Sequence, residues 1–216
     1  MSIVFNNVTK KIGRNIVINN ISCNIEKGKI TGFKGINGSG KTMLLRLIAG
    51  LIYPTSGTIE IDGKVLGKNI AFPESVGIML ENPAFINSYS GYDNLRMLAD
   101  IKGLINEKEI CEVMDLVGLS ENGKKKYRKF SLGMKQRLGI AAAIMEKPEI
   151  ILLDEPTNAL DESGVELLTG IILKERNRGA TIVISSHDAH FLNNVSNRII
   201  EISNGAITKE RNNYDI

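Results

Sequence analysis

With 216 residues, the chain is long enough for one large domain or for a domain with a subdomain, and it can bury a sizeable core. Hydrophobic residues make up 43% of it and charged residues 24%, as in an ordinary soluble globular protein. The formal net charge of +3 is too small to favour nucleic acid as a partner, no apolar run approaches the roughly 18 residues that span a bilayer, and residues 1–7 are typical of neither a signal nor a transit peptide.

The N-terminal part of the chain predicts β-strands. Residues 3–8 read as one strand, and residues 16–25 alternate imperfectly between apolar and polar side chains. Residues 58–64 alternate cleanly and end in an Asp-Gly turn, which predicts a hairpin strand. These strands indicate a small antiparallel region beside a parallel sheet. Cys23 lies in it and Cys111 far beyond it; without metal-ligand spacing, we expect two buried or inert thiols in a reducing cytosol.

A glycine-rich loop at residues 35–42, Gly-Ile-Asn-Gly-Ser-Gly-Lys-Thr, matches the phosphate-binding pattern G-x-x-x-x-G-K-[ST]. Its glycines allow the backbone to approach phosphate oxygens, and the helix expected over residues 43–49 points its free N–H groups at the same anion. A chance glycine-rich turn is disfavoured by the strand predicted over residues 29–34. Lys41 would add a charge toward the β and γ phosphates, and Thr42 a hydroxyl for Mg²⁺. The predicted nucleotide contacts are Gly35, Asn37, Gly38, Ser39, Gly40, Lys41, Thr42 and Met43.

The pattern then becomes helical. After a short strand at residues 76–80, apolar residues recur at helical spacing between residues 92 and 147. Asn106 is a suitable helix start and Gly118 a suitable helix end. We therefore expect a helical insert at residues 82–147 between two parts of an α/β core. The basic run at residues 124–129 favours a solvated loop, with a partner-facing patch as the alternative.

The last third of the chain returns to strands. Residues 149–155 form a continuous apolar run that ends in Asp154 and Glu155, which predicts a buried parallel strand with carboxylates at the edge where α/β sheets bind ligands. A helix over residues 162–178, a strand over 181–185 that leads to His187, and a hairpin over 199–207 follow. A strand-end turn and a structural histidine are the plain alternatives.

A phosphate loop alone is compatible with kinases, GTPases and many ATPases, and three later segments narrow this choice. They are Phe-Ser-Leu-Gly-Met-Lys-Gln-Arg at residues 130–137, the run at 150–161, and Ser-Ser-His at 185–187. In this order and spacing, the whole chain resembles ABC-type ATPases, the nucleotide-binding subunits of ATP-binding cassette transporters. The resemblance implies a single domain, 1–216, with the α/β fold of P-loop NTPases. A mostly parallel, RecA-like sheet would form the core at residues 1–81 and 148–216, with an N-terminal antiparallel β region and a helical subdomain at 82–147.

The resemblance also implies roles for individual residues. Residues 35–42 would bind ATP, with Lys41 on its phosphates. Asp154 would hold Mg²⁺ together with Thr42. Glu155 looks like the general base, since a carboxylate beside the metal-bound phosphate can orient water and accept its proton. His187 resembles the histidine that contacts the γ-phosphate, and residues 158–161 the loop at the dimer seam.

Ser131, Leu132, Gly133 and Met134 fall on the family's signature motif, whose usual form is Leu-Ser-Gly-Gly-Gln. In the family this motif opens a helix and faces the γ-phosphate bound by the other subunit, as suits a hydroxyl, a glycine and a helix N-terminus. The variant form resembles that of bacitracin and lantibiotic resistance subunits, which points to export or immunity.

Two positions depart from the family pattern. Glu81 aligns with a glutamine that touches Mg²⁺; its carboxylate would ligate the ion or turn outward. Ile12 aligns near the aromatic residue that stacks on adenine, and it offers apolar contact without a π face. Val17 would add a second apolar contact, so we expect loose base selectivity.

The resemblance thus implies an ATP- and Mg²⁺-dependent ATPase subunit. It would be cytoplasmic, peripheral on the membrane through a separate permease, and paired head-to-tail with an identical or different ATPase subunit. A soluble ABC ATPase in assembly or DNA transactions is the alternative, but neither a long coiled-coil insert nor a second cassette is present. A plain P-loop kinase is disfavoured by the signature and histidine motifs.

Overall fold

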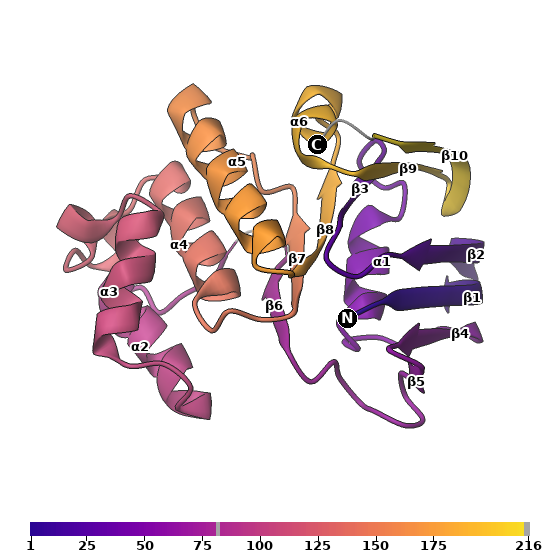
Figure 1. The fold of residues 1–216 in the computed structure, drawn as a ribbon, viewed down its shortest axis with the longest axis horizontal. Coiled ribbons are helices and arrows are strands. Elements are labelled where there is room, and N and C mark those ends of the chain that lie inside the picture. Colours follow the sequence, from indigo (N-terminus) through magenta and orange to yellow (C-terminus); the bar gives the residue numbers. More distant parts are fainter. Residues whose placement is uncertain (81–82, 214–216) are drawn as a thin grey trace.

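The computed structural model describes residues 1–80 and 83–213, which form two β-sheets and a group of helices (Figure 1). The smaller sheet is antiparallel and confirms the expected antiparallel region. Its first strand continues past residue 8. Asn7 takes a positive φ of 49° at a shift in the pairing register, and pairing with the second strand resumes after it. The strand order in this sheet is β2 (Asn15–Ile25), β1 (Ile3–Ile12), β4 (Ser56–Ile61) and β5 (Lys64–Val65).

The larger sheet is parallel except for one edge strand, as the sequence predicts. The fully buried β7 and β8 lie side by side and end at the same edge, so the residues that follow them are neighbours. The order is β10 (Ala206–Asn212), β9 (Arg198–Ser203), β3 (Ile30–Lys34), β8 (Thr181–Ser186), β7 (Ile150–Asp154) and β6 (Val76–Met79), with β10 antiparallel to β9.

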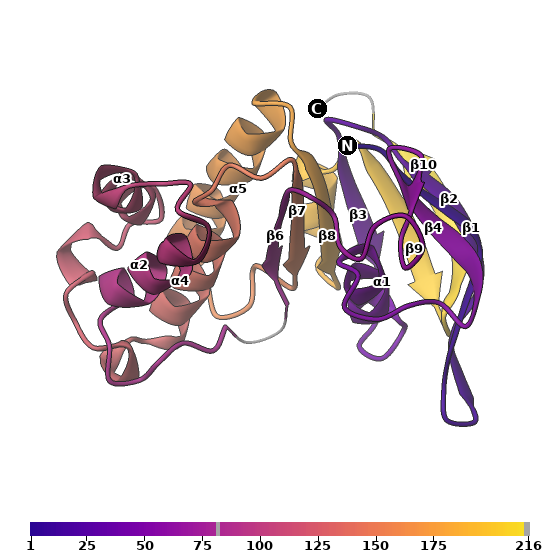
Figure 2. The same ribbon diagram turned by 90° about the horizontal axis from the view of Figure 1, so that it is seen from below.

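Alternate residues of the parallel strands belong to two hydrophobic cores, because successive side chains of a strand point to opposite faces. Ile150 and Leu152 join the core formed with helix α1 (Lys41–Ile48) and the antiparallel sheet. Figure 2 shows α1 between the two sheets. Ile151 and Leu153 join the other core, on the face covered by α4 (Leu132–Ile144), α5 (Glu162–Asn177) and α6 (Ala189–Val195).

The segment between β6 and β7 is helical, and its outer helices lie at the end of the molecule opposite the antiparallel sheet (Figures 1 and 2). It contains α2 (Gly91–Lys102), α3 (Glu107–Leu116), two short 3₁₀ helices, η1 (Ser120–Asn122) and η2 (Tyr127–Lys129), and α4. Capping boxes at Ser90 and at Asn106 start α2 and α3, and such an N-cap typically contributes about 1 kcal/mol. The predicted start at Asn106 is confirmed.

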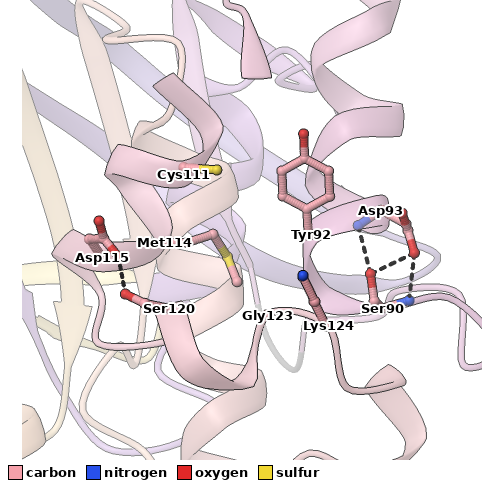
Figure 3. A pocket seen from close by; sticks show the side chains of 9 residues that line it. All are labelled: Ser90, Tyr92, Asp93, Cys111, Met114, Asp115, Ser120, Gly123 and Lys124. Atoms are coloured by element: carbon pink, nitrogen blue, oxygen red, sulfur yellow. Dashed lines mark hydrogen bonds between the residues drawn. The ribbon is translucent and has the colours of Figure 1, made fainter. Parts of the chain in front are cut away.

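A cavity of about 490 Å³ opens between α2, α3 and the loop that follows α3 (Figure 3). Cys111 lies on its wall and is exposed, so of the two expected alternatives, buried or inert, burial does not hold for this thiol. Cys23 is half-buried, and burial raises its pKa to about 12, so its thiolate is scarce. The cavity is lined by Ser90, Tyr92, Asp93, Cys111, Met114, Asp115, Ser120, Gly123 and Lys124.

Helix α6 was not predicted. It is only seven residues long, too short for a clear helical period in the sequence. Its start carries a recognisable signal, because the carboxylate of Asp188 accepts a hydrogen bond from the backbone N–H of Phe191. Among the described residues, no helix is long and apolar enough to cross a membrane.

Candidate nucleotide-binding site

The glycine-rich loop connects the carboxyl end of β3 to the start of α1, as predicted. Gly40 is the N-cap of α1, with a φ of 111° that residues with a Cβ atom rarely adopt. At Gly35, an added Cβ would lie 2.4 Å from the carbonyl oxygen of Ile202, so the loop cannot take a larger residue there. The free N–H groups at the start of α1 favour an anion in front of the loop.

Lys41 is the buried cation of this loop, with only 5% of its surface exposed. Its Nζ donates hydrogen bonds to the carbonyl oxygens of Gly35, at 2.7 Å, and Ile36, at 3.1 Å. Nζ also lies 3.3 Å from Oε1 of Glu155. A buried ammonium needs such partners, and its charge stands ready for phosphate oxygens.

A hydroxyl and a carboxylate meet beside Lys41. Oγ1 of Thr42 donates a 2.7 Å hydrogen bond to Oδ2 of Asp154 at the end of β7, and Oγ of Ser185 donates to Oδ1. In residues 1–80 and 83–213, no three His, Cys, Asp or Glu side chains group closely enough to hold a metal by themselves. Mg²⁺ commonly uses one or two carboxylates, waters and substrate phosphates, so this pair suits Mg²⁺ that arrives with a phosphate ligand.

Glu155 follows β7, and its side chain forms hydrogen bonds with residues at the end of β8. Its Oε2 lies 2.8 Å from Nδ1 of His187 and accepts weaker hydrogen bonds from the backbone N–H of His187, at 3.3 Å, and from Oγ of Ser186, at 3.4 Å. The backbone of Glu155 is left-handed, with a φ of 46°. A largely buried carboxylate held beside a histidine and a lysine is suited to orienting water and accepting its proton.

Of these residues, Lys41, Thr42 and Glu155 line a cavity of about 550 Å³, a volume typical of small-molecule sites. Oγ of Ser39 and Oε1 of Glu155 are buried without a hydrogen-bond partner among the described residues, although the ion pair with Lys41 compensates Oε1. Buried polar groups are usually satisfied, so Oε1 of Glu155 suits a polar ligand, whereas Ser39, like Gly35, is not among the lining residues. The cavity is lined by Ile16, Val17, Asn37, Gly38, Gly40, Lys41, Thr42, Met43, Glu155, Asn204 and Gly205.

Three of the lining residues were missed by sequence analysis: Ile16, Asn204 and Gly205. The β9–β10 turn reaches the cavity because the N–H of Gly205 donates to the carbonyl of Ser39 and its carbonyl accepts from the N–H of Asn19. The Asn-Gly turn was predicted, but nothing local placed it here. Ile12 lies near the hairpin end of β1, is 51% exposed, and is not among the lining residues. Glu81 lies outside the described residues.

Ser131, Leu132, Gly133 and Met134 are also absent from the cavity lining. Ser131 is the N-cap of α4, and its Oγ accepts a hydrogen bond from the N–H of Met134. Leu132 is 72% exposed. The predicted helix start is confirmed, and it presents a hydroxyl and free N–H groups on a surface separate from the cavity.

A model of the ABC transporter family matches residues 18–158. The chain belongs to the ABC transporter family. Among its relatives, the uncharacterized ABC transporter ATP-binding protein YybJ of Bacillus subtilis (strain 168) is 49% identical over 93% of this chain and 92% of that protein. The bacitracin transport ATP-binding protein BcrA of Enterococcus faecalis is 38% identical over 95% of this chain and 68% of that protein. The lantibiotic transport ATP-binding protein SrtF of Streptococcus pyogenes is 36% identical over 97% of this chain and 90% of that protein.

Solved structures confirm the predicted fold of this ABC transporter subunit. A dimeric post-hydrolysis state of the ATP-binding cassette MJ0796, bound to ADP and Pi, superposes with a TM-score of 0.85 at 26% identity, covering 97% of this chain and 98% of that chain. The expected membership in the family, its ATP binding and its ATPase activity are thereby confirmed, and transport is favoured over the soluble alternative.

Proposed function

We propose that this ATPase powers export of an antimicrobial peptide or related compound through a separate membrane permease. One observation carries the catalytic part: the phosphate loop and Glu155 line one cavity, and Thr42 of that lining is hydrogen-bonded to Asp154. The transport substrates in the names of BcrA and SrtF support the substrate class. The chain would act from the cytoplasm, on the inner face of the membrane, with ATP and Mg²⁺ as cofactors.

In the proposed mechanism, Lys41 and the backbone N–H groups of the loop bind the β and γ phosphates of ATP. Thr42 and Asp154 would hold Mg²⁺, with Glu81 proposed as a further ligand, and the ion would supply charge neutralisation on the phosphates. Glu155 orients the attacking water and accepts its proton, while His187 keeps the Glu155 carboxylate in place and contacts the γ-phosphate.

We further propose that two such subunits pair head-to-tail around ATP. Ser131, Leu132, Gly133 and Met134 do not line their own cavity, yet they offer a hydroxyl and a helix N-terminus suited to an anion. Across a dimer seam, they would meet the phosphate bound by the partner subunit. The dimeric assembly of the MJ0796 cassette supports this arrangement.

The base of ATP would rest on apolar side chains of the β1–β2 hairpin. Val17 and Ile16 line the cavity, and Ile12 is on the same hairpin. Because apolar contact reads little of the base edge, we expect GTP and ATP to compete within about tenfold, which is ~1.4 kcal/mol. Competition binding with the wild type measures this. Ile12→Ala and Ile16→Ala compare the two positions, and a much stronger preference for ATP would show that specific base contacts exist.

We expect the permease to dock on the helical segment. The end of α2 leaves Met97 43%, Leu98 38%, Ile101 77% and Leu104 63% exposed, and the cavity of Figure 3 opens beside the start of the same helix. Apolar side chains gathered on one surface indicate an interaction site. The double substitution Ile101→Asp and Leu104→Asp should abolish co-purification with a polytopic membrane protein from detergent extracts, while the isolated subunit keeps its ATPase activity.

Leu51→Asp is the matched control, because Leu51 is a similarly exposed apolar residue, at 54%, on the α/β core. It should leave co-purification unchanged. Recovery of the wild-type chain without any membrane partner would favour the soluble alternative, and equal losses for both variants would remove the helical segment from the docking role.

A further inference from the structure

We propose that Gln136 is a positioning residue for Glu155. Its side-chain amide would hold the turn after β7 in the conformation that aims the Glu155 carboxylate, and would tie that turn to the signature helix α4. The inference rests on the proposed role of Glu155 as the general base.

The turn after β7 contains two residues with unfavourable backbone conformations. Glu155 has a φ of 46° and Ala159 a φ of 61°, in the left-handed region that residues with a Cβ atom rarely adopt. Such conformations persist where the surrounding structure holds them. On one side, the N–H of Glu155 donates a 2.9 Å hydrogen bond to the carbonyl of Ser185 in β8.

On the other side, the turn is held by Gln136. This side chain is buried, with 5% of its surface exposed, and its Nε2 lies 3.2 Å from the carbonyl oxygens of both Glu155 and Pro156. The amide nitrogen can thus donate one hydrogen to each carbonyl. The carbonyl of Glu155 also accepts the N–H of Asn158, at 3.1 Å. Gln136 therefore fixes the two peptide units that follow the catalytic carboxylate.

Helix α4 touches the same turn at a second place. An added Cβ on Gly133 would lie 2.9 Å from the carbonyl oxygen of Ala159, so the first turn of α4 packs directly on the backbone there. Gly133 belongs to the signature segment and Gln136 follows one turn later on the same rigid helix. A displacement of the helix start by a partner's phosphate would therefore reach the backbone of Glu155.

Gln136→Met tests the assignment, because methionine keeps the length and burial but donates no hydrogen bond. We expect kcat for ATP to fall about tenfold or more, as small misplacements of a catalytic group do. KM should stay within about threefold, since the phosphate loop is untouched. If Glu155→Gln is inactive but Gln136→Met has the kcat of the wild type, the assignment is overturned.

A double variant separates positioning from general damage. If Gln136 acts through Glu155, adding Gln136→Met to Glu155→Gln should cause no further loss of turnover, because the group being aimed is already disabled. Additive losses would mean that Gln136 acts elsewhere, which overturns the proposal. Wild-type turnover in Glu155→Gln alone would instead remove the proposed role of Glu155, so the two failures are distinguishable.

Asn94→Leu is the matched control. Asn94 is likewise buried, at 4%, and its amide holds the backbone at Ile86 and Ser90 with three hydrogen bonds, but it lies at the start of α2. It should lower thermal stability while kcat stays near that of the wild type. A loss of kcat as large as that of Gln136→Met would show that buried amides matter here only for folding.

Gln136→Glu provides a second variant in case the methionine variant fails to fold. Its carboxylate faces two carbonyl oxygens when ionised, whereas the protonated form can donate to one of them. Burial favours protonation, so kcat relative to the wild type should rise as pH is lowered from about 8 to about 6. A ratio that is independent of pH would contradict the hydrogen-bonding role.

Discussion

Glu155→Gln should reduce ATP turnover by ~10²-fold or more, the scale of lost general-base catalysis, while ATP binding survives. The amide keeps the side-chain shape and one oxygen toward His187 or Lys41, but it cannot accept a proton from water. Steady-state phosphate release and equilibrium ATP binding measure the two quantities. Glu149→Gln removes the same charge just before β7 begins, away from the cavity, and should leave turnover unchanged.

The same variant tests the pairing of subunits. If ATP links two subunits and hydrolysis releases them, Glu155→Gln should accumulate as a dimer with MgATP and return to a monomer with MgADP. Size-exclusion chromatography under both conditions measures this. A monomer in both, at high protein concentration, would count against the ATP-linked homodimer. Wild-type turnover in the variant would exclude Glu155 as the general base.

Lys41→Ala should weaken ATP binding by roughly a hundredfold, because a charge-assisted contact with phosphate contributes ~2–3 kcal/mol. The side chain also bonds two loop carbonyls and pairs with Glu155, so its removal disorganises the loop itself. Titration calorimetry measures the affinity, and circular dichroism should show an intact fold.

Lys34→Ala is the control for Lys41→Ala. Lys34 lies at the end of β3, the strand that leads into the phosphate loop. It forms a partly exposed ion pair with Glu201, at 3.1 Å, but it does not line the cavity. Its loss should leave ATP affinity near the wild-type value, since exposed pairs contribute little. Normal ATP binding by Lys41→Ala would refute the phosphate-loop assignment.

The parts of the site that were predictable are those encoded by short segments. The loop from Gly35 to Thr42 and the end of β7 carry their chemistry in consecutive residues, and the elements around them follow from local hydrophobic patterns. Ile16 and Gly205 were missed because their place depends on how β2 and the β9–β10 turn meet the loop. Gln136 belongs to the segment at residues 130–137 that carries the family resemblance, but its role was not predicted, since a glutamine in a helix acquires its partners only when α4 packs against the turn after β7.

The support of the phosphate loop by the β9–β10 turn has a consequence for synthesis. The loop itself is translated by residue 42, but Gly205 must be present before its N–H can bond Ser39 and its carbonyl can bond Asn19. These contacts span more than three quarters of the chain, and contacts between distant residues close late in folding. A nascent chain that still lacks the β9–β10 turn therefore lacks one wall of the cavity, and we expect it to bind nucleotide more weakly than the finished chain.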